Sequence, residues 1–387
     1  MEFSKRLNNL PSQFFATLVK KVGDAVLEGL DVIDLGQGNP DQPTPPHIVQ
    51  AVQEAVANPL NHKYSPFRGT GGFKKAASNF YKREYNVDID PETEVAILFG
   101  TKIGLVELPL ALMNEHELML LPDPGYPDYL SGVGLANVEF NTMPLLEENN
   151  FLPDYNSLTE VQKQQAKLMY LNYPNNPTGA IANLDFFQET VSLAKENDIA
   201  VVHDFAYGGI GFDGLKPISF LQAEGAKDVG IEMYTLSKTY NMAGWRVGFA
   251  VGNPKIIEAI NIIQDHLFVS IFPAVQDAAT VALNGSQACV KELVDLYEGR
   301  RRTLVEACTS IGWKVTAPKG SFFAWLPVPD NYTSESFADL LLQEADVAVA
   351  AGNGFGSSGE GYIRVGLLVD EDRLKEAVAR IGKLHLF

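Results

Sequence analysis

Short apolar runs alternate with helical patterns through the middle of the chain. The runs cover residues 94–100, 117–123, 138–145, 166–174, 199–207, 232–238 and 246–252. Several are apolar at successive positions, which is typical of strands that helices cover on both faces. Helical periodicity lies between them, most clearly over 184–197, and also over 103–114 and 126–135. This alternation predicts an α/β fold with a mostly parallel sheet, whose ligands bind at the carboxyl ends of the strands.

The rest of the chain predicts a smaller α+β unit. A helix is expected over 287–311, with Arg300, Arg301 and Arg302 on a solvated face, and another over 371–384. Strands are expected over 313–317, 322–328, 347–351 and 362–368. The predicted division is an N-terminal arm that joins the smaller unit, a large domain and a C-terminal domain, over residues 1–47, 48–285 and 286–387.

Composition narrows the function classes. The chain has 387 residues, 46% of them hydrophobic, so we expect a large core that needs no disulfide or structural metal. Its net charge is −18. The negative charge disfavours nucleic acid and anionic membranes as partners. Two cysteines without CxxC spacing predict reduced thiols in the cytoplasm, and six histidines show no metal-ligand spacing. No export signal or membrane span is expected.

The segment Gly354-Phe-Gly-Ser-Ser-Gly359 matches the G-x-G-x-x-G pattern of dinucleotide-binding folds. That pattern needs a helix after the third glycine, so that the helix N-terminus meets the pyrophosphate. A predicted strand follows here instead. We therefore interpret the segment as a glycine-rich loop without a nucleotide.

A stronger pattern surrounds Lys238, in Thr235-Leu-Ser-Lys238-Thr-Tyr-Asn-Met-Ala-Gly-Trp-Arg246-Val-Gly248. The lysine follows a buried run, stands between hydroxyl side chains and precedes Arg246 by eight positions. A lysine beside apolar segments can simply extend to solvent. In an α/β site it can also form a Schiff base with a carbonyl cofactor such as pyridoxal 5'-phosphate.

That cofactor needs an anion beside its ring nitrogen, donors for its phenolate and a cradle for its phosphate. Asp204 follows a buried run and can supply the anion, since an unpaired buried carboxylate is otherwise costly. Tyr207 and Asn176 can supply donors, although turn chemistry alone explains the N-P-T-G segment. A strand-to-helix turn at Gly100-Thr101-Lys102 can hold the phosphate.

Seven motifs in order complete this pattern: LGQGNPD, FGTKIG, PDPGYP, NYPNNPTG, HDFAYG, TLSKTYNMAGWRVGF and YIRVG. The chain resembles the class I/II, fold-type I, pyridoxal-phosphate aminotransferases, and within them the bacterial methionine-salvage enzymes that act on 4-methylthio-2-oxobutanoate. The resemblance implies a seven-stranded mostly parallel sheet in an α/β/α sandwich, a smaller α+β domain, and a homodimer with shared sites.

The resemblance also implies roles for the cofactor side of the site. Lys238 resembles the Schiff-base lysine, and Asp204 resembles the partner of the pyridinium nitrogen. Tyr207 and Asn176 resemble the residues that bind the phenolate, and Tyr126 resembles the ring that stacks on the cofactor. The residues that resemble phosphate contacts are Thr101, Lys102, Thr235, Ser237 and Arg246, together with Tyr64 toward the partner subunit.

On the substrate side, Gly38, Asn176 and Arg364 resemble the groups that hold the α-carboxylate, because arginine binds a planar carboxylate through two parallel bonds. Phe14 and Phe15 are expected to close over the site. Residues 266–273, which the resemblance places near the neighbouring subunit's site, hold no Arg or Lys, so we expect an apolar 2-oxo acid as acceptor.

Two further readings and one backbone feature remain to be tested. The same cofactor site can serve a carbon–sulfur β-lyase or racemase, or an aminotransferase of aromatic, alanine or diaminopimelate type. A regulator that retains the cofactor site would need a DNA-binding domain, for which the length and the charge leave no room. By resemblance to the family's N-P-T-G turn, Asn176–Pro177 is expected to be cis.

Overall fold

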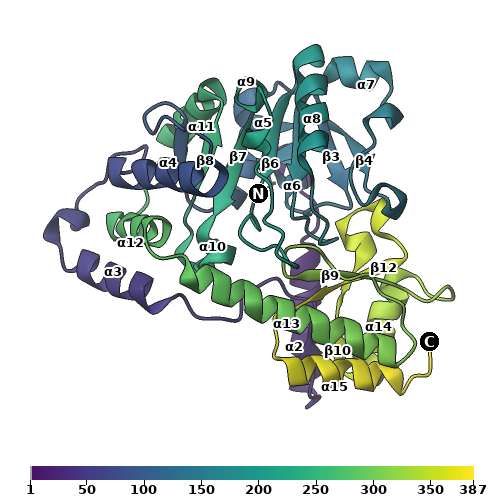
Figure 1. Ribbon diagram of the computed structural model, residues 1–387. Helices are drawn as coiled ribbons and strands as arrows, with labels where there is room; N and C mark the ends of the chain where they lie inside the picture. The colour runs from purple at the N-terminus through teal and green to yellow at the C-terminus, as the bar shows by residue number, and fades with distance from the viewer. Residues whose placement is uncertain (1) are drawn as a thin grey trace.

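A seven-stranded sheet forms the centre of the protein in a computed structural model that describes residues 2–387 (Figure 1). β8 runs antiparallel to both neighbours, and the remaining pairs are parallel, which confirms the predicted mostly parallel sheet. In spatial order the strands are β2 (Val95–Leu98), β8 (Gly248–Gly252), β7 (Gly230–Thr235), β6 (Ala200–Asp204), β5 (Ala166–Asn172), β3 (Leu118–Asp123) and β4 (Glu139–Pro144).

Helices cover both faces of this sheet. Side chains alternate between the faces along each strand, so Val95 and Ile97 join one core while Ala96 and Leu98 join the other. The first core is covered by α4 (Gly71–Tyr85), α8 (Leu184–Asn197) and α12 (Pro273–Asn284). The second is covered by α5 (Thr101–Leu112), α6 (Tyr129–Ala136) and α11 (Pro254–Leu267). The expected α/β/α sandwich is confirmed.

A smaller α+β unit lies below the large sheet in Figure 1, and α13 runs down along it. Its three-stranded sheet is antiparallel, and a separate parallel pair joins the N-terminal β1 to β10. The strands are β9 (Phe323–Pro327), β11 (Ala350–Ala351), β12 (Tyr362–Gly366), β1 (Ile33–Asp34) and β10 (Val347–Ala348). The helices are α2 (Phe14–Leu27), α13 (Ala288–Ser310), α14 (Ser334–Ala345) and α15 (Glu371–Gly382).

The remaining helices are short or lie at the edges of the molecule. The α-helices among them are α1 (Lys5–Asn8), α3 (Pro46–Val56), α7 (Glu160–Gln165), α9 (Ala226–Val229) and α10 (Leu236–Thr239), and the 3₁₀ turns include η1 (Pro59–His62). Across residues 2–387, no helix is both long and apolar enough to cross a membrane.

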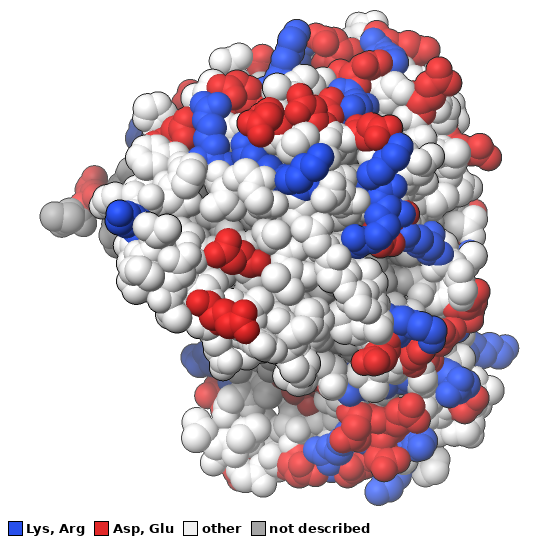
Figure 2. All heavy atoms as spheres, turned by 60° about the vertical axis from the view of Figure 1, so that its left-hand side comes forward, with Lys and Arg blue, Asp and Glu red and all other residues white. Residues whose placement is uncertain are grey.

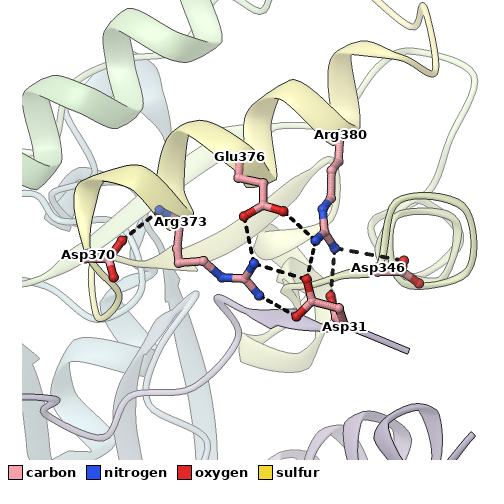
Figure 3. Close-up of polar contacts among 6 residues, drawn as sticks. All are labelled: Asp31, Asp346, Asp370, Arg373, Glu376 and Arg380. Atoms are coloured by element: carbon pink, nitrogen blue, oxygen red, sulfur yellow. Dashed lines mark hydrogen bonds and ion pairs between the residues drawn. The ribbon is translucent and has the colours of Figure 1, made fainter. Parts of the chain in front are cut away.

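An ion-pair network ties the start of β1 to α15 (Figure 3). The spacing of Arg373, Glu376 and Arg380 puts all three on one face of the helix. Both arginines pair with Asp31, at 2.9 and 2.5 Å, and these bonds lower the pKa of its carboxyl to about 2. Exposed pairs of this kind stabilise little individually. The network locates the chain beside β10, where the Ile33 N–H donates to the Asp346 carbonyl.

Two expectations for the smaller unit are wrong. Residues 313–317 form no strand, because Trp313 stacks on Phe387 and its indole N–H donates to the Pro327 carbonyl. Arg300 is buried rather than solvated, since the face of α13 that carries it turns inward to an ion pair with Asp41 at 2.7 Å. Its neighbour Arg301 is only partly exposed and pairs with Asp213, while Arg302 is exposed.

Candidate active site

A cavity of about 330 Å³ opens at the carboxyl ends of β5, β6 and β7. It brings together thirteen of the fifteen site residues predicted from the sequence. They are Phe15, Gly38, Thr101, Lys102, Tyr126, Asn176, Asp204, Tyr207, Thr235, Ser237, Lys238, Arg246 and Arg364. The cavity therefore lies where a parallel sheet places ligand contacts.

The cavity also contains residues that the sequence analysis missed, namely Asn39, Leu105, Asn172, Ala206, Ala243 and Phe323. Asn172 could have been predicted from the sequence, because it is the last residue of β5, just as Asp204 is the last residue of β6. Its side-chain amide donates to the Asp204 carbonyl at 2.7 Å, and its Oδ1 accepts the Asn176 N–H at 2.8 Å. Phe323 gave no local signal, since its role comes from packing on a distant arginine.

Lys238 lies on α10, one turn beyond the end of β7. Its Nζ donates to the Gly38 carbonyl at 2.8 Å. Burial, followed by the positive charges of Arg364 and Arg246, lowers the pKa of its amine from 10.5 to about 8. An appreciable fraction of the amine is therefore neutral near pH 8, and a neutral amine can act as a nucleophile or a base.

Asp204 ends β6 and is 5% exposed. Its Oδ2 accepts the Tyr129 hydroxyl at 3.0 Å, while its Oδ1 is buried without a hydrogen-bond partner. Burial raises the pKa of this carboxyl to about 6, and the Tyr129 bond opposes that rise. A buried acceptor without a partner is costly, so Oδ1 is suited to a ligand's N–H or positive charge.

The opposite end of the cavity is built for an anion. α5 begins at Thr101 and has no side-chain cap, so the N–H groups of its first turn remain available to a ligand. The preceding Gly100 has φ +78°, and a Cβ there would collide with the Arg246 guanidinium. The Thr235 hydroxyl donates to Ser237 Oγ at 2.9 Å. Backbone N–H groups, hydroxyls and an arginine thus face the same space.

Lys102 differs from the expected phosphate contact. Its Nζ pairs with Asp128 at 2.8 Å, and its side chain is half exposed. Its backbone N–H, in the first turn of α5, can still contact an anion, whereas its ammonium would have to leave Asp128 by a change of rotamer.

Arg364 occupies the centre of an aromatic cage and is 1% exposed. Its guanidinium carbon lies 3.9 Å from the Phe323 ring centre, 4.7 Å from Phe355 and 5.1 Å from Phe15. Its Nη1 donates to Asn176 Oδ1 at 2.9 Å, and its Nε has no partner. Burial lowers its pKa to about 10, so it stays cationic at neutral pH and can bind a carboxylate.

Two tyrosines line the cavity between these groups. Burial raises the pKa of Tyr207, and burial with the nearby Asp128 charge raises that of Tyr126. Both hydroxyls therefore remain protonated and can donate hydrogen bonds.

Tyr64 and Phe14 lie outside the cavity lining. Tyr64 is 85% exposed, beyond η1. Phe14 packs against Phe15 and Phe355, with ring centres 5.2 and 5.5 Å away. It therefore supports the cage around Arg364 from behind.

His203 is fully buried, and both nitrogens of its ring have partners other than Asp204. Its Nδ1 lies 2.6 Å from Glu232 Oε2, and its Nε2 accepts the Tyr173 N–H at 3.2 Å.

The N-P-T-G turn contains the cis peptide bond that was predicted between Asn176 and Pro177, so this prediction is confirmed.

The residues of this cavity fit pyridoxal 5'-phosphate. The first turn of α5 and Arg246 match the phosphate, and the unpartnered Oδ1 of Asp204 matches a protonated ring nitrogen. The Lys238 amine matches the aldehyde, and the Arg364 cage is left for a substrate carboxylate.

Comparisons with known proteins agree with this chemistry. Residues 30–381 match the family model for aminotransferase class I and II. The chain is 66% identical over 386 residues to the L-glutamine–4-(methylsulfanyl)-2-oxobutanoate aminotransferase of Bacillus subtilis (strain 168), covering all of this chain and 97% of that protein. It is 45% identical to an LL-diaminopimelate aminotransferase of Dehalococcoides mccartyi, over 99% of this chain and 98% of that one.

The solved structure of apo-BacF from Bacillus subtilis is similar to the chain over its whole length. The TM-score is 0.96 at 48% identity, covering 100% of this chain and 99% of the other. The likeness therefore includes both the large sheet and the smaller unit.

Proposed function

Because the chain belongs to the class I and II aminotransferases, we propose that it transfers the amino group of glutamine to 4-methylthio-2-oxobutanoate, which yields methionine. The observation that carries this proposal is the 66% identity, over the full chain, to an enzyme named for that reaction. The site agrees with an apolar acceptor, because the rings of Phe15, Phe323 and Phe355 surround its carboxylate-binding arginine.

The enzyme is a pyridoxal-phosphate-dependent transaminase. The bound cofactor supplies an electron sink that makes the α-proton of an amino acid removable. The protein supplies position, charge and a proton carrier. Arg364 orients the substrate through its α-carboxylate, with Asn176 holding the guanidinium in place at 2.9 Å.

Lys238 is the proton carrier of this proposal. Its lowered pKa, about 8, gives an amine that takes and returns a proton near neutral pH. Its bond to the Gly38 carbonyl points the amine toward the Arg364 side of the cavity, since Gly38 lies beside that guanidinium. The same amine is the covalent anchor for the cofactor aldehyde.

The unpartnered Oδ1 of Asp204 would hold a proton on the ring nitrogen of the cofactor, which would keep the ring a strong electron acceptor. The Tyr129 hydroxyl stabilises its anionic form. With the cofactor bound, the hydroxyl of Tyr207 and the amide of Asn176 would donate to its phenolate, and Tyr126 would pack against its ring. Thr101, Thr235, Ser237 and Arg246 would hold the phosphate, and Lys102 would contribute through its backbone N–H.

The acceptor preference tests this function. With glutamine as the fixed donor, we expect kcat/KM for 4-methylthio-2-oxobutanoate to exceed that for oxaloacetate by about 100-fold or more. An unpaired carboxylate in an apolar pocket costs several kcal/mol, whereas each buried CH₂ contributes about 0.8 kcal/mol. Steady-state kinetics with both keto acids, at equal enzyme concentration, provide the measurement.

The outcome that would contradict the proposal is an equal preference, or a preference for oxaloacetate. It would require a second cation for the distal carboxylate. Release of pyruvate and ammonia from a cysteine conjugate, with no acceptor present, would instead establish a β-lyase.

We also propose a homodimer in which Tyr64 reaches the partner's phosphate site. Figure 2 turns the side with α3, α4 and α12 toward the viewer and shows a broad face with few charged side chains. Around these elements, η1 with the segment that follows it, the end of α11 and the residue before α12 expose large apolar side chains, namely Leu60, Tyr64, Phe67, Leu267 and Phe272. An exposed apolar area of this kind is typical of a subunit interface.

Light scattering should give twice the 42.3 kDa of one chain for the native protein. Phe272→Asp should shift it toward the monomer, because a charge would be buried without a partner. Phe140→Asp is the matched control, since Phe140 has a similar exposed fraction, 42% against 44%, on the far edge strand β4. A native monomer would contradict the dimer.

We also propose the domain division and the cellular location that the sequence predicts. The domain division at residues 1–47, 48–285 and 286–387 is supported by the separation of the seven-stranded sheet from the three-stranded sheet and the β1–β10 pair. A cytoplasmic location is supported by the two free cysteines, Cys289 and Cys308.

A further inference from the structure

The glycine-rich loop at residues 354–359 binds the side-chain carboxylate of Asp123, which belongs to the large sheet. Asp123, the last residue of β3, is 3% exposed. Its Oδ2 accepts the Ser357 hydroxyl at 2.8 Å, and its Oδ1 accepts the Ser358 N–H at 3.0 Å. The loop comprises two short 3₁₀ turns and leads into β12, which carries Arg364. These bonds therefore connect the large sheet to the strand of the substrate-binding arginine.

The loop is shaped closely around this carboxylate. Gly356 has φ +134°, and a Cβ on it would overlap Asp123 Oδ1. A Cβ on Gly354 would overlap the Phe14 ring in the same way. The G-x-G-x-x-G spacing thus has a structural reason here that does not involve a phosphate.

Phe355 lies between these two glycines and is held from both sides. Its carbonyl accepts the N–H of Gly125, two residues after Asp123. Its ring is 4% exposed, lies 4.7 Å from the Arg364 guanidinium carbon and meets the Phe15 ring at 5.9 Å. The bonds between Asp123 and the loop therefore help to hold the Phe355 ring against the Arg364 guanidinium.

We propose that Asp123 and Ser357 are positioning residues for substrate binding, which act by holding Phe355 against the Arg364 guanidinium. This role rests on the proposed function, in which Arg364 binds the substrate carboxylate. A cation–π wall on a buried guanidinium fixes the plane of its donors, and bidentate carboxylate binding depends on that plane. Neither positioning residue lines the cavity itself.

The loop offers a matched pair of variants. Ser357→Ala removes the hydroxyl that donates to Asp123, whereas Ser358→Ala leaves that residue's backbone N–H donor in place. Ser357→Thr restores the hydroxyl at an exposed position. A hydrogen bond to a charged group corresponds to about a tenfold change in an equilibrium constant. In the cofactor-loaded enzyme, Ser357→Ala should raise KM for 4-methylthio-2-oxobutanoate about tenfold and leave kcat within twofold, while the other two variants stay close to native.

A double-mutant cycle tests whether Ser357 acts through Phe355. Phe355→Leu alone should raise KM in the same manner, and adding Ser357→Ala to it should cause little further change. Fully additive effects would overturn the proposal, because Ser357 would then act by another route. Equal effects of Ser357→Ala and Ser358→Ala would overturn it as well.

A binding measurement separates this inference from the proposed function. The affinity of the unreactive carboxylate 4-(methylthio)butanoate, measured by calorimetry, should fall about tenfold in Ser357→Ala. Hydrogen exchange at residues 352–359 should become faster in the same variant. If no amino transfer is found but affinity and exchange change as expected, the proposed reaction fails and the positioning role stands. If transfer proceeds but neither quantity changes, the positioning role fails alone.

Discussion

Replacing Lys238 by alanine is expected to lower kcat by about three to four orders of magnitude or more. The substitution removes the general base, which alone contributes about 10² to 10⁴, and it removes the covalent anchor of the cofactor as well. The cavity has no spare amine in position, since the other lysine that lines it, Lys102, is paired with Asp128 at 2.8 Å. Single-turnover kinetics with glutamine, beside circular dichroism to verify folding, provide the measurement.

Reductive trapping identifies the lysine directly. Borohydride treatment of the native enzyme, followed by peptide mass mapping, should label the peptide that contains Lys238 and no other. Lys102→Ala is the matched control and should retain the label, because its ammonium lies outside the proposed anchor. A stable adduct on another lysine would contradict the assignment.

Asp204→Asn is expected to lower kcat by about 100- to 1,000-fold, the usual effect of removing one preorganised charge from an active site. Asparagine keeps the shape and can still accept the Tyr129 hydroxyl, which bonds to Oδ2 at 3.0 Å. It loses the negative charge at the unpartnered Oδ1, so the ring nitrogen no longer stays protonated and the ring accepts electrons poorly. Steady-state kcat and the visible absorbance spectrum of the bound cofactor measure both effects.

Tyr129→Phe provides a graded control for this prediction. It leaves the carboxylate but removes the bond that opposes the rise of its pKa, so the pKa should rise further above about 6. A moderate loss of kcat, smaller than that of Asp204→Asn and recovering as pH increases, is expected. A kcat within threefold of native for Asp204→Asn would show that the ring charge does not limit the reaction.

The sequence determined the large sheet and the ends of its strands. The seven apolar runs became seven strands because continuous apolar runs and helix periodicity are local properties of the sequence. The candidate residues at those ends, Asp204 and Thr235, met in one cavity because parallel strands end at the same edge. The motif order supplied the remaining residues through resemblance. Where a local pattern misled, as at residues 313–317, the stacking of Trp313 on a residue 74 positions later decided the conformation.

Only the tertiary structure decided how these groups are tuned. The partners of Arg364 include Asn176, 188 residues away, and the ring of Phe323 on the neighbouring strand. No local sequence pattern indicates the ion pair between Lys102 and Asp128, which holds the Lys102 ammonium away from its expected phosphate contact. The same is true of the hydrogen bond from Ser357 to Asp123, which are 234 residues apart. Periodicity and turn preference act over a few residues, whereas a pKa or a guanidinium plane depends on burial and on charges that come together only when the chain packs.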